Sequence, residues 1–139
     1  MAEGDGVIYN KFKVRILNKE IDLDTDTLKL GLTSAYTPDI DADLTWADAG
    51  TEEVGSGYTT GGQTVAGASL TLVSASDLAK FDATDVIFTG LDVGTPSHAV
   101  LYDTTASDAL VAYWELGSTA SNGGNYTIAW NASGIITIT

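Results

Sequence analysis

Short stretches of alternating apolar and polar residues run along most of the chain, a pattern typical of β-strands that bury one face. The clearest is 27–33, where Leu28, Leu30 and Leu32 alternate with polar or small residues. Similar patterns predict strands at 68–74, 79–83, 85–90, 97–103, 109–116, 126–130 and 135–139. Turn-forming Gly, Asn, Asp and Ser residues separate several of them. The sequence therefore predicts an all-β fold, a sandwich or barrel, as one domain over 1–139.

The N-terminal segment 8–19 fits two structures. Phe12, Val14 and Ile16 alternate with basic residues, as they would in a strand. Ile8, Phe12 and Ile16 also recur every four residues, as they would in a short helix. The pattern alone leaves both open.

Residues 34–66 differ from the rest of the chain. The segment holds Pro38, three alternating aspartates over 39–43 and four glycines over 55–62. We interpret it as a long excursion with little regular structure. Compact domains seldom carry such a loop without a function, and contact with a partner is one such function.

The charge of the chain is strongly negative and unevenly placed. Nineteen acidic residues face six basic ones, for a net charge of −13. Such a surface repels phosphate, so neither nucleic acid nor an anionic membrane is an expected partner. Four of the six basic residues lie close together, at Lys11, Lys13, Arg15 and Lys19. They form either a solvated basic face or a basic docking element on an acidic body.

Residues for catalysis or metal binding are sparse. Cysteine is absent, and the single histidine, His98, lies in a predicted strand without a nucleophile motif nearby. The alternating aspartates over 22–26 have the spacing that opens a calcium loop, but threonines at 27 and 33 stand where such a loop needs Gly and Glu. We therefore expect no enzyme activity, no cofactor and no metal site.

The three tryptophans divide by context. Trp114 and Trp130 lie in predicted strands, where the indole ring usually belongs to the core. Trp46 lies in the long loop and is the better candidate for a contact surface. A sugar-stacking platform on these rings, as in a carbohydrate-binding module, is an alternative function.

Six short motifs are spread over nearly the whole length of the chain. They are YNKFK (9–13), IDLDTDTLK (21–29), TSAYTP (33–38), EVGSGYTTGG (53–62), FDATDV (81–86) and WNASGII (130–136). In combination they resemble small structural proteins of tailed phages and prophages. The resemblance implies a virion component similar to capsid cement, or decoration, proteins, with a jelly-roll-like antiparallel sandwich and a short N-terminal helix over 8–19. It implies no catalytic residues.

The expected function is therefore capsid decoration: binding to the major capsid protein on the outer surface of the virion, with self-association as a dimer or trimer. A tail, neck or fibre component is the nearest alternative. Aromatic residues and arginine dominate binding hot spots. We therefore expect the docking surface on the basic segment and the long loop, at Tyr9, Lys11, Phe12, Lys13, Arg15, Tyr36, Trp46 and Tyr58.

Overall fold

The computed structural model describes residues 6–139 and confirms the mainly β, antiparallel fold, with 37% of residues in strands and 10% in helices. The strands are β1 (Val7–Ile8), β2 (Leu28–Ala35), β3 (Thr51–Glu52), β4 (Gln63–Thr64), β5 (Ser69–Val73), β6 (Leu78–Asp82), β7 (Val86–Phe88), β8 (His98–Asp103), β9 (Ala109–Glu115), β10 (Tyr126–Ile128) and β11 (Ile136–Ile138). The helices are α1 (Asn10–Leu17) and two 3-10 turns, η1 (Trp46–Asp48) and η2 (Ser74–Ser76).

The largest sheet contains the strands with the most extensive pairing. Its order is β1-β9-β8-β2-β3, and β4 also pairs with β2. One face of the sheet carries Leu28, Leu30 and Leu32 of β2, next to Ala99 and Leu101 of β8. All five side chains are buried, so the alternation of β2 identified the core-facing side correctly.

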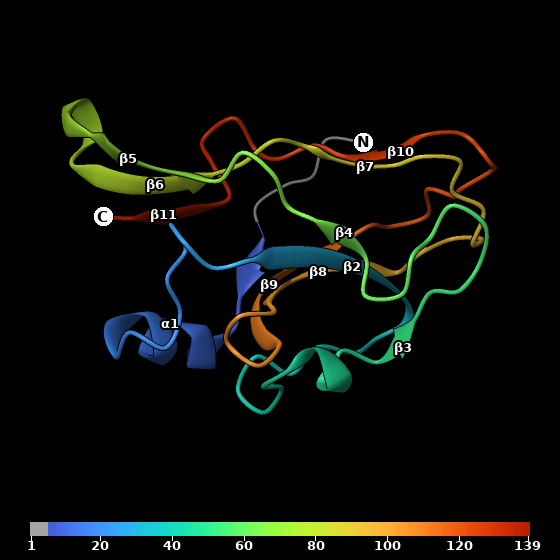
Figure 1. The fold of residues 1–139 in the computed structure, drawn as a ribbon, viewed down its shortest axis with the longest axis horizontal. Helices are drawn as coiled ribbons and strands as arrows, with labels where there is room; N and C mark the ends of the chain where they lie inside the picture. The colour runs from blue at the N-terminus through green and yellow to red at the C-terminus, as the bar shows by residue number, and fades with distance from the viewer. Residues whose placement is uncertain (1–5) are drawn as a thin grey trace.

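Two smaller sheets form the second layer. They are β10-β7 and β11-β6-β5, and they lie along the upper side of the molecule in Figure 1. Phe88 of β7 and Ile128 of β10 are fully buried, and the indole rings of Trp114 and Trp130 lie 5.0 Å apart. The predicted core role of these two tryptophans is confirmed by their burial.

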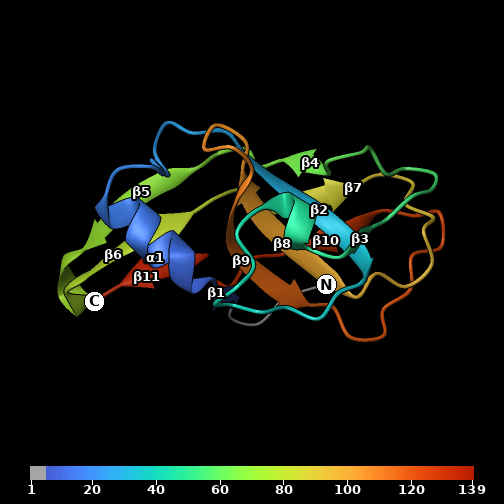
Figure 2. The same ribbon diagram turned by 90° about the horizontal axis from the view of Figure 1, so that it is seen from below.

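The opposite face of the main sheet is also covered. It carries His98, Val100 and Tyr102 of β8, which are also buried. Seen from below in Figure 2, α1 and the turn around η1 lie in front of the sheets. Trp46 of η1 stacks on Tyr102, with ring centroids 4.8 Å apart. A strand as apolar as β8 needs cover on both faces, and this N-terminal and loop layer provides it.

The ambiguous N-terminal segment forms the helix α1 rather than a strand. Phe12 and Ile16, four residues apart, lie on its inward side and pack with the core. The backbone N–H of Asn10 donates to the carbonyl oxygen of Ile40 at 3.0 Å, which ties the start of the helix to the long loop. The four-residue period places both apolar side chains on the inward face of this helix.

The 34–66 segment contains more regular structure than its composition predicts. It includes η1 and two short strands, β3 and β4, that both pair with β2. The Tyr58 hydroxyl accepts a hydrogen bond from the Leu32 N–H at 3.1 Å and donates to the Glu52 carboxylate at 2.9 Å. The segment is long because it runs around β2 and closes the edge of the sandwich, and not because it extends away from the domain.

Candidate functional site

Two of the predicted docking residues lie inside the domain. Tyr9 and Phe12 are 0% and 1% exposed, so their side chains are core and the prediction was wrong for them. The Tyr9 hydroxyl is within 2.6 Å of the Tyr36 hydroxyl, and the latter also donates to the Asp43 carboxylate at 2.7 Å. Burial raises the pKa of both tyrosines. Neither Tyr9 nor Phe12 is accessible to a partner while α1 stays in place.

The three predicted aromatic residues of the long loop are half-buried and are used within the fold. Tyr36 packs edge-on against His98, with ring centroids 5.4 Å apart. Trp46 covers Gly31 closely enough that a β-carbon there would overlap its indole ring. The ring of Tyr58 stacks on Phe88 at 5.9 Å. Because Trp46 already uses one face to stack on Tyr102, it is a poor sugar platform.

The predicted basic residues differ from one another. Lys11 and Lys13 are exposed on α1, whereas Arg15 is held within the fold. The Arg15 guanidinium donates to the carbonyl oxygen of Leu44 at 3.0 Å and lies 3.5 Å from the Glu20 carboxylate. Of the eight predicted residues, only Lys11 and Lys13 are therefore placed as a docking surface requires.

A different surface meets that requirement better. In the three-stranded sheet, the registers Leu70–Phe81–Ile136 and Leu72–Ala79–Ile138 put six apolar side chains on one face. In the inner row, Phe81 and Ile136 are covered by the core at 2% and 5% exposure, whereas Leu70 at the edge is 52% exposed. In the outer row, Leu72 is 72% exposed and Ile138 is 55% exposed. We call these six residues the apolar sheet face.

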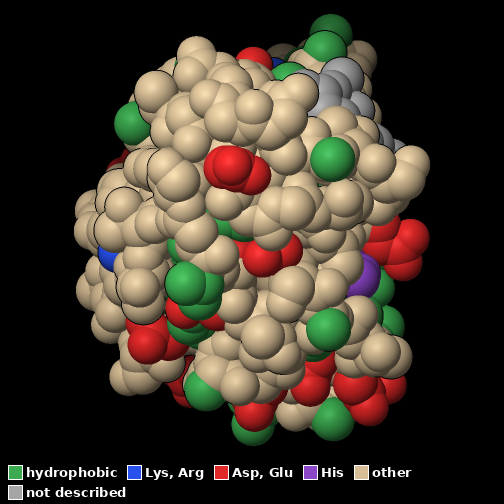
Figure 3. Space-filling view, turned by 90° about the vertical axis from the view of Figure 1, so that its right-hand side faces the viewer, with side chains coloured by type: hydrophobic (Ala, Val, Ile, Leu, Met, Phe, Trp, Pro, Cys, Tyr) green, Lys and Arg blue, Asp and Glu red, His purple; other side chains and the backbone are tan. Residues whose placement is uncertain are grey.

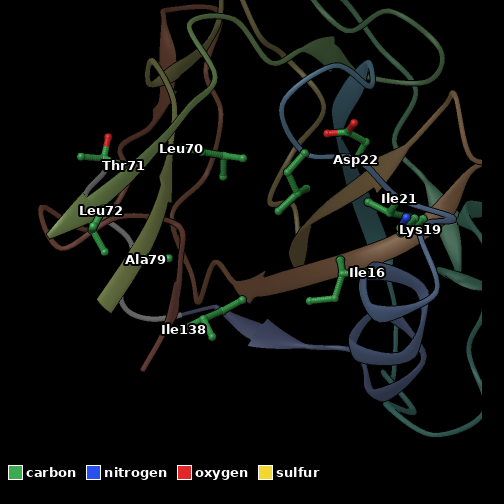
Figure 4. Close-up of a pocket in the computed structure, with 10 residues that line it drawn as sticks. Ile16, Lys19, Ile21, Asp22, Leu70, Thr71, Leu72, Ala79 and Ile138 are labelled. Atoms are coloured by element: carbon green, nitrogen blue, oxygen red, sulfur yellow. The ribbon is translucent and has the colours of Figure 1, made fainter. Parts of the chain in front are cut away.

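The outer half of this face borders a hollow of about 550 Å³. Ile16 of α1 and the segment 19–23 line the opposite wall (Figure 4). Thr71 also lines the hollow, although its side chain points to the other face of the sheet, so the hollow reaches the edge of β5. We call this hollow the α1–β5 groove. Its volume is in the range of ligand sites, and its walls are mostly aliphatic.

The charge around the groove differs from that of the rest of the molecule. Lys19 lines the groove, and within residues 6–139 it makes no ion pair. Asp22 also lines it, but its carboxylate accepts the backbone N–H of Asp24 at 3.0 Å and so serves the local turn. At the opposite end of the domain, Figure 3 shows many acidic side chains and hardly any basic ones. The groove is therefore a mostly apolar end of an acidic domain, with one lysine and one aspartate in its lining.

Sequence reasoning identified the strand that carries Leu70 and Leu72 but missed their exposure. Alternation shows that a strand has an apolar face, and it says nothing about what covers that face. The one usable signal was the set of two apolar rows that cross the three strands at 69–73, 78–82 and 136–138. Using this signal would have required knowing how the three strands pair before the structure was known.

The lone histidine does not form a nucleophile–base pair. His98 Nδ1 lies 3.0 Å from the Ser97 hydroxyl, but that hydroxyl donates its proton to the carbonyl oxygen of Thr33 at 3.0 Å. The Ser97 oxygen is then left to accept a proton from the imidazole, the reverse of what a general base needs. Burial lowers the pKa of His98, which favours its neutral form.

No group of three or more His, Asp or Glu side chains within residues 6–139 is arranged to hold a metal ion. None of the helices described there has the length and apolar character needed to cross a membrane.

Asp103 is the carboxyl group with the most perturbed surroundings, and its role is structural. It is fully buried, and its Oδ1 accepts the backbone N–H groups of Thr105 and Ala106 at 2.8 and 3.0 Å. Burial, with a smaller contribution from the nearby Asp26 carboxylate, raises its pKa to about 6 against the opposing effect of the two N–H donors. The folded state therefore binds this proton more tightly than the unfolded chain does. The contribution of Asp103 to the free energy of unfolding therefore falls as pH rises from about 4 to 6.

Replacing Asp103 with asparagine is expected to stabilise the protein at pH 7. The amide oxygen still accepts both N–H groups, and the cost of ionising a buried carboxyl, about 2–3 kcal/mol, disappears. The difference in free energy of unfolding between variant and wild type should shrink toward zero at pH 4. Urea titrations at pH 4, 5, 6 and 7 measure it, and a difference independent of pH would contradict the assignment.

No protein-family model matches this chain, and neither a curated protein nor a solved structure matches it. The fold and the groove therefore carry the functional argument.

Proposed function

We propose that this chain is a non-enzymatic binding domain that docks on a protein partner through the α1–β5 groove. More particularly, we propose a capsid decoration protein of a tailed phage. It would bind the major capsid protein on the outer surface of the virion and bridge coat subunits, with self-association as a dimer or trimer. The resemblance of its sequence to virion proteins supports the second step.

The observation that supports docking through the α1–β5 groove is the uncovered half of the apolar sheet face. Leu70, Leu72 and Ile138 are each more than half exposed and lie on one wall of a single groove. Val14 and Leu17, on the solvent side of α1, are exposed as well. Clustered exposed aliphatic side chains mark interaction surfaces more often than scattered single ones do.

The physical properties of the domain suit this role. A capsid shell under outward load from packed DNA gains from many small contacts that bridge neighbouring subunits. An apolar patch at one end gives a docking site, and an acidic opposite end keeps finished particles apart by charge repulsion.

Replacing Leu72 with aspartate is expected to reduce binding to particles at least about tenfold. The change removes about 2 kcal/mol of apolar burial and places a charge in the interface. Leu72 is 72% exposed in the free protein, so its stability should change by less than about 1 kcal/mol. The measurement is the copy number of the chain relative to the major coat protein in purified particles, by quantitative mass spectrometry.

Ile87→Asp is the matched control. Ile87 is 49% exposed on β7, outside the groove, so the same substitution there should leave occupancy unchanged. Equal occupancy for wild type and the Leu72 variant would reject the groove as the docking site. A wild-type copy number orders of magnitude below that of the coat protein would instead favour a tail, neck or fibre component.

A further inference from the structure

We infer that the α1–β5 groove takes an extended apolar segment of the partner that also carries carboxylates, and that this segment adds as a strand beside β5. The inference rests on the proposed function only for the source of the segment, the coat subunit. The shape and chemistry of the segment follow from the groove itself.

The edge of β5 favours an extended occupant. In the part of the chain that the structure describes, β5 has a strand neighbour, β6, on one side only. The groove reaches its other side at Leu70, Thr71 and Leu72. An edge strand presents unpaired backbone N–H and C=O groups, and an added strand both pairs with them and continues the pleat. Five residues of β5 offer pairing over about 16 Å.

The side chains of the occupant follow from the faces of the sheet. A strand beside β5 places every second side chain next to Leu70 and Leu72, on the apolar sheet face. Figure 4 shows Leu70 directed across the groove toward the segment that carries Ile21 and Asp22. Apolar residues at these alternate positions would fill the hollow and cover the exposed outer row.

Lys19 favours a carboxylate at one of the remaining positions. It lines the hollow without an ion-pair partner among residues 6–139, and the Asp22 carboxylate beside it accepts the backbone N–H of Asp24. A second copy of this chain is a poorer occupant. Its acidic end is folded, with Glu52 accepting the Tyr58 hydroxyl and Glu53 buried, so it offers no free extended strand.

The test uses a labelled seven-residue peptide of alternating valine and glutamate, and a second peptide with lysine in place of glutamate. Fluorescence anisotropy against the full chain should show binding of the acidic peptide and little of the basic one. Lys19→Glu should weaken the acidic peptide about fivefold and strengthen the basic one. Leu72→Asp should abolish binding of both, and Ile87→Asp should change neither. Hydrogen exchange should slow at the β5 amides when the acidic peptide binds.

Several results would overturn the inference. They are no binding of the acidic peptide, binding that Leu72→Asp leaves intact, or slowed exchange away from β5. Light scattering could also show that the wild-type chain self-associates. If Leu72→Asp removes this self-association and Ile87→Asp does not, the groove would be assigned to a second copy of the chain. Peptide binding and particle occupancy separate the two proposals. If particle occupancy depends on Leu72 but the acidic peptide does not bind, the extended segment is rejected as the occupant of the groove. If the acidic peptide binds but the chain is absent from particles, the extended segment is supported and the decoration function is rejected.

Discussion

Replacing Phe12 with alanine is expected to lower the free energy of unfolding by about 3–5 kcal/mol, the usual cost of truncating a buried phenylalanine. Phe12 is 1% exposed and belongs to the main core cluster. Its loss leaves a cavity beneath α1, and a helix of eight residues has little stability of its own without packing. Urea unfolding followed by tryptophan fluorescence measures the change.

Leu17→Ala is the control for this experiment. Leu17 lies on the same helix but is 84% exposed, so its truncation should change stability by no more than about 0.5 kcal/mol. If Phe12→Ala were equally mild and instead reduced binding to particles, Phe12 would be a docking residue as its sequence context predicts.

Replacing Gly62 with alanine is expected to cost about 2–4 kcal/mol. Gly62 has a φ of +79°, a conformation that residues with a side chain adopt only with strain. It is also packed directly on β2, where a β-carbon would overlap the carbonyl oxygen of Leu30. Backbone atoms in a paired strand cannot move aside cheaply, so either β4 separates from β2 or the turn at 59–62 is rebuilt.

Gly94→Ala separates the two causes. Gly94 has a similar φ of +86°, but no atom lies within 4 Å of the position of an added β-carbon. Its substitution should therefore cost only the conformational strain, about 1 kcal/mol. Thermal unfolding of both variants gives the comparison, and equal losses would show that contact with Leu30 is unimportant.

The longer strands could be predicted from the sequence because each has its own local signal, whereas β1, β3 and β4, of two residues each, were not predicted. Alternation at 28–32 and the runs at 98–103 and 109–115 needed no knowledge of the tertiary structure. The helix at 10–17 could not be decided in this way, since eight residues fit either period. The contact of Asn10 with Ile40, thirty residues away, is part of what fixes it.

The exposure of the apolar sheet face could not be predicted, for a physical reason visible in two pairs of residues. Tyr9 and Tyr36 have the composition of a binding hot spot, but their rings cover Tyr113 on the second face of the main sheet. Leu70 and Leu72 have the pattern of core, but the sheet that carries them extends beyond the layer that would cover it. Aromatic and aliphatic side chains gain equally from burial inside a domain or against a partner, so composition does not distinguish the two.

The pairing of β1 with β9 also bears on synthesis of the chain. Val7 lies opposite Tyr113, so the first described strand meets its neighbour only after 106 further residues have been made. At about 5–20 residues per second, a ribosome needs roughly 5–20 s to supply them. During that interval the apolar strand β2 has no β8 to pair with, and the nascent chain cannot complete its main sheet. Completion of this sheet therefore waits until β9 has been made.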